Sequence, residues 1–201
     1  MKPTQITRLA VLAAAVVAAV LAGYAVDRAT AQRARFACNA DLRGLKTLSD
    51  PQRKLVRLVP KGTTLEAING LPMPRPTPAR RTTAFSRQVW RIRAQITEYR
   101  IRGDGDVHLV LYDGGRSYMI AKMPSAACLS AKTRARGSIV RARAFFEGLC
   151  GPARSSWRPL GAVVRIDGVG FWSVPTDQNG HARNHAELHP VTRIQLIEGC
   201  A

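Results

Sequence analysis

Two pairs of side chains in this sequence place a carboxylate and an imidazole two residues apart. Asp106 and His108 form the first pair, and Glu187 and His189 form the second. Side chains two apart on a strand point to the same face at a spacing of roughly 6.5–7 Å, so each pair could converge on one ion or polar group. If the two segments lie side by side, the four groups suit a divalent metal ion such as zinc or manganese, or general acid–base chemistry.

Each of these residues also has a structural interpretation, which we favour. Asp106 could close the turn at Gly105, and Glu187 could pair with one of the many arginines. His189 precedes Pro190, which biases its backbone towards an extended conformation, and its ring could donate to a backbone carbonyl. The four residues then serve to hold the segment before the last strand onto the rest of the domain.

Other parts of the sequence give no sign of catalysis. His181 and His185 are four residues apart, but the Gly and Asn residues around them are typical of a loop and not of a helix. The sequence contains no nucleophile elbow, no HExxH motif, no phosphate-binding loop and no cofactor fingerprint. We therefore expect a non-enzymatic protein without a cofactor. The alternative hypothesis is a metal-dependent hydrolase or nuclease that uses the Asp106, His108, Glu187 and His189 set.

The elements that would position these residues are mostly strands. Apolar and polar residues alternate over residues 88–101, and short apolar segments bounded by Gly, Asp or Pro follow at 106–113, 117–122, 162–167 and 191–198. Between residues 130 and 149 the apolar spacing changes to that of a helix, which Gly137 and Ser138 could divide into two pieces. The order β-β-β-α-β-β predicts a mainly β (β+α) domain over residues 87–201, an OB-like five-stranded barrel with one helix.

Residues 32–86 predict an irregular, Pro-rich extension that wraps the barrel. Four prolines in residues 71–78 exclude a helix there. A short helical turn is expected earlier, with Thr63 or Thr64 as its N-cap and Gly70 at its end.

Residues 1–31 have the pattern of an export signal. Lys2 and Arg8 precede an uncharged apolar run over residues 9–26, and Ala29 and Ala31 match a signal-peptidase cleavage pattern. An alternative cut lies after Ala25, and an uncleaved segment could anchor the chain in a membrane through residues 9–26. In every case the remainder is exported, to the periplasm or beyond the cell.

Export gives the cysteines a role. The four cysteines are an even number in an oxidising compartment, and none belongs to a CxxC pair, so two disulfides are expected rather than a zinc site. Three pairings are compatible with the sequence. We favour Cys128 with Cys150, which brackets the helical segment, and Cys38 with Cys200, which ties the two ends of the domain together.

The chain is strongly basic. It carries 31 Lys and Arg against 13 Asp and Glu, which gives a net charge of +18. Such a field attracts phosphate polymers, anionic lipid or acidic glycans, so the partner could be an anionic polymer, or else an envelope protein. Arg91, Arg93, Arg141 and Arg143 are candidate anion-binding residues. Because 25 of the 31 cations are arginines in an Ala-rich chain, the charge could instead reflect composition alone.

Several motifs together resemble a family of uncharacterised exported bacterial proteins. They are KTLSD at 46–50, GDxHLVL at 105–111, GVGF at 168–171 and ELHPV at 187–191. The resemblance covers nearly the whole chain after the export signal and implies export and architecture, but no activity. Members of that family often have an acidic residue in place of Lys122 and a histidine in place of Thr176. If those positions ligate a metal there, this chain lacks two of the ligands.

Overall fold

The computed structural model describes residues 36–38, 40–175 and 178–200. The expected export signal, with its apolar run and cleavage positions, lies outside these residues, as does Thr176. Within the described part of the chain, no helix has both the length and the apolar character needed to cross a membrane.

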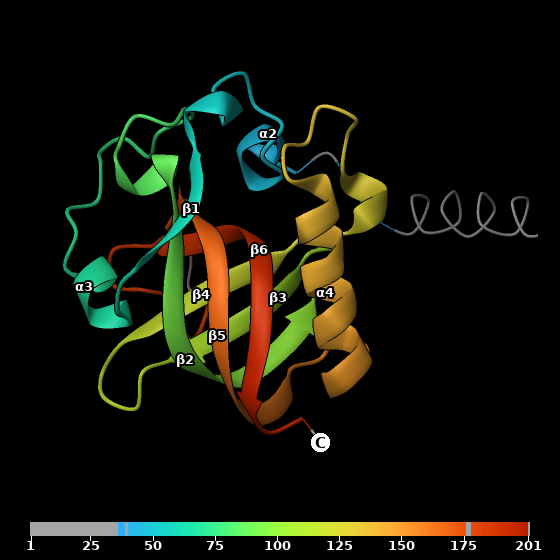
Figure 1. Ribbon diagram of the computed structural model, residues 1–201. Helices are drawn as coiled ribbons and strands as arrows, with labels where there is room; N and C mark the ends of the chain where they lie inside the picture. The colour runs from blue at the N-terminus through green and yellow to red at the C-terminus, as the bar shows by residue number, and fades with distance from the viewer. Residues whose placement is uncertain (1–35, 39, 176–177, 201) are drawn as a thin grey trace, which may run out of the picture.

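The fold is mainly β. Six strands form one sheet in the order β1-β2-β3-β4-β6-β5, and because β2 also pairs with β5, the five strands β2 to β6 close into a ring. Neighbouring strands in the ring are antiparallel except for β4 and β6, which run parallel. Figure 1 shows this ring with helix α4 beside it and the N-terminal segments at one end. The strands are β1 (Arg57–Gly62), β2 (Gln88–Ile101), β3 (Val107–Tyr112), β4 (Tyr118–Met123), β5 (Arg158–Trp172) and β6 (Ala186–Glu198).

The apolar residues that alternate along β2 are buried, as the sequence predicted. Ile92, Ala94 and Ile96 are buried, and they join apolar side chains of the other ring strands in the main core. This burial is the dominant force that closes the ring, since it removes one full face of each strand from water.

The last two strands are longer than expected. The sequence suggested strands over 162–167 and 191–198, whereas β5 continues to Trp172 and β6 already begins at Ala186. The added residues are buried on both faces, so they lack the alternation that marks a half-exposed strand. Glu187 and His189 consequently lie within β6 and not in a loop before it.

One helix follows β4, as expected, but its start differs. Helix α4 (Arg136–Cys150) is a single piece that begins after Ala135, so Gly137 and Ser138 lie inside it and do not divide it. Its buried face carries Ile139, Ala142 and Phe146, and it packs mainly against β6.

The N-terminal extension is more regular than its composition suggested. It contributes strand β1, which pairs in parallel with β2. The short helix predicted there is confirmed, because Thr64 caps it by accepting a hydrogen bond from the Ala67 amide, and Gly70 ends it. The short helices are α2 (Arg43–Lys46), η1 (Arg53–Leu55), α3 (Leu65–Asn69), η2 (Phe85–Arg87) and, after β4, η3 (Ala126–Cys128).

A buried arginine ties separate parts of this extension together. The Arg81 guanidinium contacts Asp50 Oδ2 at 2.9 Å and donates to the carbonyls of Leu45 and Ser86. The side chain of Arg81 is almost completely buried, so these partners replace the water that it loses.

All four cysteines are in disulfides, but the favoured pairing was wrong. Cys38 bonds to Cys128, and Cys150 bonds to Cys200. The first bond ties the extension to η3, and the second joins the end of α4 to the C-terminal end of β6. Two disulfides indicate an oxidising location outside the cytoplasm.

Candidate functional site

Three of the four predicted site residues meet inside the protein. His189 Nε2 lies 3.0 Å from Asp106 Oδ2, and His189 Nδ1 lies 4.0 Å from Glu187 Oε2. The two predicted pairs therefore converge, although β3 and β6 are not neighbours in the ring, because β4 lies between them. The edge of the Phe171 ring packs against the His189 imidazole at 5.5 Å between ring centroids.

Two cations that the motifs did not predict complete this group. Lys122 Nζ lies 2.9 Å from Glu187 Oε2, and Arg43 Nη1 donates to Asp106 Oδ1 at 3.1 Å. Lys122 reaches Glu187 because β4 and β6 run parallel with Ile120 opposite Glu187. We call Asp106, His108, Glu187 and His189, together with Arg43 and Lys122, the buried charge cluster.

His108 belongs to this cluster by position but has a different partner. Its Nδ1 atom lies 3.2 Å from Gln178 Oε1, and it stands opposite Lys122 across the β3–β4 pair. Its Nε2 atom is buried and has no hydrogen-bond partner among the described residues.

Burial sets the protonation states of the cluster. It lowers the pKa of His108 and of His189, and the nearby Lys122 ammonium lowers both further. Burial alone would raise the pKa of Asp106, but its contact with His189 and the charge of Arg43 hold that pKa well below its usual range. The cluster therefore contains neutral imidazoles beside an ionised aspartate at neutral pH.

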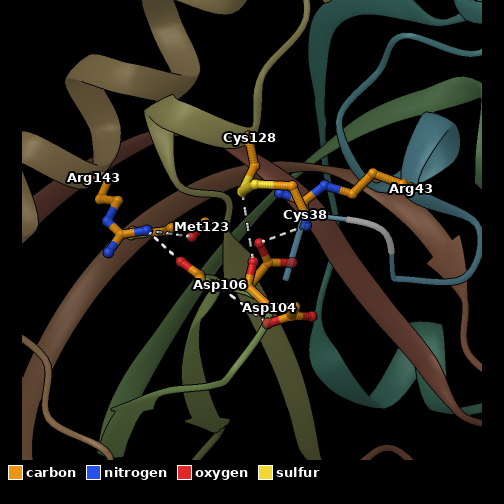
Figure 2. The surroundings of a disulfide bond; sticks show 8 residues. Cys38, Arg43, Asp104, Asp106, Met123, Cys128 and Arg143 are labelled. Atoms are coloured by element: carbon orange, nitrogen blue, oxygen red, sulfur yellow. Dashed lines mark hydrogen bonds and ion pairs between the residues drawn. A yellow bond between two sulfur atoms is a disulfide. The ribbon is translucent and has the colours of Figure 1, made fainter. Parts of the chain in front are cut away.

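A disulfide lies next to Asp104 and Asp106, at the turn before β3 (Figure 2). The Cys38–Cys128 bond lies beside the Asp104 carbonyl, and the Ala37 amide donates to the Gly103 carbonyl at 3.0 Å. Phe36 packs onto Gly105, where a Cβ atom would come within 2.8 Å of its ring. The turn before β3 is thus held down directly above Asp106.

The carboxylates of the cluster and His189 are shielded from solvent, whereas the Arg43 and Lys122 side chains are 14% and 12% exposed. Asp106 and His189 have side chains that are 0% exposed, and the Glu187 side chain is 4% exposed. Among the described residues, no group of three or more His, Cys, Asp or Glu side chains is arranged to hold a metal ion. The residues chosen for their chemistry are brought together, but within the protein interior.

An open groove lies elsewhere on the molecule. It has a volume of about 510 Å³ and runs between β1 and α4, over strands β2, β5 and β6. Figure 1 shows β1 and α4 on either side of these strands. Leu58 and Pro60 line one wall, and Arg141 and Phe145 line the other. We call it the α4–β1 groove.

A row of three charged residues crosses the floor of this groove. Arg91, Asp167 and Arg193 are register partners on β2, β5 and β6. Both carboxylate oxygens of Asp167 accept hydrogen bonds from Arg91, each at 2.8 Å. Arg193 stands next to this pair, and its side chain has no hydrogen bond or ion pair within the described residues.

The predicted anion-binding arginines divide into two groups. Arg91 and Arg141 line the groove, and Arg93 is exposed outside it. Arg143 must be removed from the set of accessible residues, because it is buried and donates to the Gly105 carbonyl at 2.6 Å while pairing with Glu147. Its place on the inner face of α4 explains this difference from the expectation.

Sequence motifs missed Arg43, Lys122 and Arg193. The carboxylates that Arg43 and Lys122 contact, Asp106 and Glu187, lie far from them in the sequence, so only the fold brings these cations to the cluster. A signal for Lys122 was present, since it lies on a strand that should pair with the one carrying His108. No comparable signal exists for Arg193. Its guanidinium lacks a carboxylate partner among the described residues because Asp167 pairs with Arg91 instead, and the sequence does not show that pairing.

Comparisons with known proteins show no family. No protein-family model and no curated protein matches the chain. Among solved structures, it is similar to one described as "putative aspartyl-tRNA synthetase from Leishmania major Friedlin", at 13% identity and a TM-score of 0.41. That match covers 72% of this chain and 22% of the other, so this chain spans about a fifth of that protein's length.

Proposed function

We propose that this protein is an exported, disulfide-stabilised, non-enzymatic binding module whose basic surface engages an anionic partner. The observation that carries this proposal is the contrast between the two sites. The residues suited to catalysis or metal binding are enclosed and paired with one another, whereas the open groove is lined by arginines and apolar side chains.

The architecture supports the same proposal. A ring of five strands in the order β2-β3-β4-β6-β5, with helix α4 between β4 and β5 in the sequence, is the arrangement expected for an OB-like barrel. Such barrels serve many binding functions, so the fold supports a binding role without specifying the ligand.

A metal-dependent hydrolase is the alternative. The Lys122 ammonium stands against Glu187 at 2.9 Å, where it supplies the positive charge that a metal ion would otherwise provide. Elemental analysis of the purified, oxidised protein separates the two proposals. We expect no stoichiometric transition metal. One equivalent of metal that is lost in an His108→Ala/His189→Ala variant would overturn the binding-module proposal.

Retention on charged matrices tests the binding role itself. The oxidised protein is applied to immobilised heparin, DNA and polyglutamate, and eluted with a salt gradient beside an unrelated basic protein of matched net charge. We expect the protein to elute from at least one matrix at clearly higher salt than the control, because a shaped site adds contacts to the general field. If the protein eluted from all three matrices at the same salt concentration as the control, its charge would be only compositional.

A further inference from the structure

We infer that the α4–β1 groove binds an acidic polypeptide segment that carries apolar side chains between its carboxylates. This inference rests on the proposed function and names the partner class and the surface. It begins from the charges on the groove floor, where both oxygens of Asp167 accept from Arg91 and the Arg193 side chain has no ion-pair partner among the described residues.

A second unpaired cation stands on the wall above this floor. Arg141 of α4 is exposed, its closest hydrogen-bond contact is Ser138 Oγ at 3.4 Å, and no described carboxylate pairs with it. Two guanidinium groups thus line one groove without a counter-charge from the described residues. Each has a planar fork of donors that matches a carboxylate, so an acidic ligand would complete both.

The walls of the groove add an apolar requirement. Phe145 is 46% exposed and Leu58 is 37% exposed, and both line the groove. A ligand with only charged groups would leave these surfaces in water, whereas aliphatic or aromatic side chains of a peptide would cover them.

This combination favours a polypeptide over a nucleic acid. Strands of single-stranded nucleic acid bind on successive aromatic side chains that stack with the bases. Phe145 is the one aromatic residue among the described groove-lining residues, and its neighbours there are aliphatic side chains and arginines.

The test compares two matched pairs of arginines. Arg141→Ala/Arg193→Ala removes two positive charges from the groove. Arg93→Ala/Arg165→Ala removes two exposed charges from the neighbouring positions of the same sheet, outside the groove. All four residues are exposed, so both variants should fold, which the melting temperature of the oxidised protein checks.

The probe is a fluorescein-labelled peptide in which Glu alternates with Leu and Phe, and its binding is followed by fluorescence anisotropy. We expect the groove variant to bind about tenfold more weakly than wild type, and the control variant to lose less than about threefold. We also expect Leu58→Ser/Phe145→Ser to weaken binding of this peptide while leaving binding of polyglutamate unchanged.

Each other outcome overturns a specific statement. Equal losses for the two arginine pairs would overturn the groove assignment and leave the basic binding module standing. Binding to heparin or DNA without binding to the peptide would overturn the partner class alone. Absence of salt-dependent binding to any anionic ligand would overturn the proposed function and this inference with it.

Discussion

His189 and Asp106 contact each other at 3.0 Å with both side chains fully shielded from water. They come from segments more than eighty residues apart, and their contact links the start of β3 to β6 across β4. The parallel β4–β6 seam that they span has only two register pairs, Ile120 with Glu187 and Ala121 with Leu188. The buried charge cluster therefore reinforces the shortest pairing in the ring.

Replacing Asp106 tests this role. Asp106→Asn removes the negative charge that compensates Arg43 and contacts His189. We expect the free energy of unfolding to fall by about 3 kcal/mol, because breaking a buried ion pair leaves an uncompensated charge. Urea denaturation of the oxidised protein measures the loss. Asp41→Asn, at an exposed position, should change stability by less than about 0.5 kcal/mol. Similar values for the two variants would contradict a stabilising role.

Acidification should destabilise the protein in two steps. Burial lowers the pKa values of His108 and His189 below 6.5 in the folded protein. As the pH falls below about 6.5, the two histidines therefore bind protons in the unfolded chain more readily than in the folded protein. Each histidine then costs up to about 1.4 kcal/mol per pH unit. The charged groups that face them are Asp106, Glu187 and Lys122.

The second step belongs to Asp106. Its pKa is lowered in the folded state, so its contribution is present above about 3.8 and is lost as the pH falls further. Urea midpoints measured from neutral to acidic pH should decrease through the histidine window. The decrease there should be flatter in an His108→Gln/His189→Gln variant. An unchanged slope in this variant would show that other groups cause the acid sensitivity.

Much of this arrangement was readable from the sequence, for physical reasons that differ by element. Alternation identified β2 because one of its faces is buried and the other is not. The same criterion failed for the end of β5 and the start of β6, where both faces are buried. It also missed β1, in which Leu58 and Val59 are both exposed, so no buried face shows in the pattern.

The candidate site was predictable only in part. The two-residue spacing identified Asp106, Glu187 and His189, because strand geometry is local. Their cations and their burial depend on which strands neighbour each other, which local spacing does not contain. The disulfide pairing failed for a related reason, since loop-closure entropy varies slowly with loop length and does not select one pairing.

The disulfide connectivity gives a direct prediction. Proteolysis without reduction should release Cys38 linked to Cys128 and Cys150 linked to Cys200. Mass spectrometry of these fragments checks the pairing, and a Cys128–Cys150 fragment would contradict it.

Loss of the Cys38–Cys128 bond through Cys38→Ser/Cys128→Ser should lower the free energy of unfolding by about 2–5 kcal/mol. It should also speed hydrogen exchange at the Asp106 amide, because the bond holds the turn above that residue.

The GVGF segment makes a final prediction about backbone packing. Gly170 lies against the Phe85 carbonyl so closely that a Cβ atom would overlap it, and Phe85 belongs to η2, which packs against β5. We expect Gly170→Ala to lower the free energy of unfolding by about 2 kcal/mol or more. Gly148→Ala is the matched control, because a Cβ there meets no atom within 4 Å. Since Gly148 lies in α4, alanine should raise stability by up to about 1 kcal/mol. Urea denaturation of both variants distinguishes a steric requirement at position 170 from a general tolerance of alanine. If Gly170→Ala were as stable as wild type, the close approach of β5 and Phe85 would be contradicted.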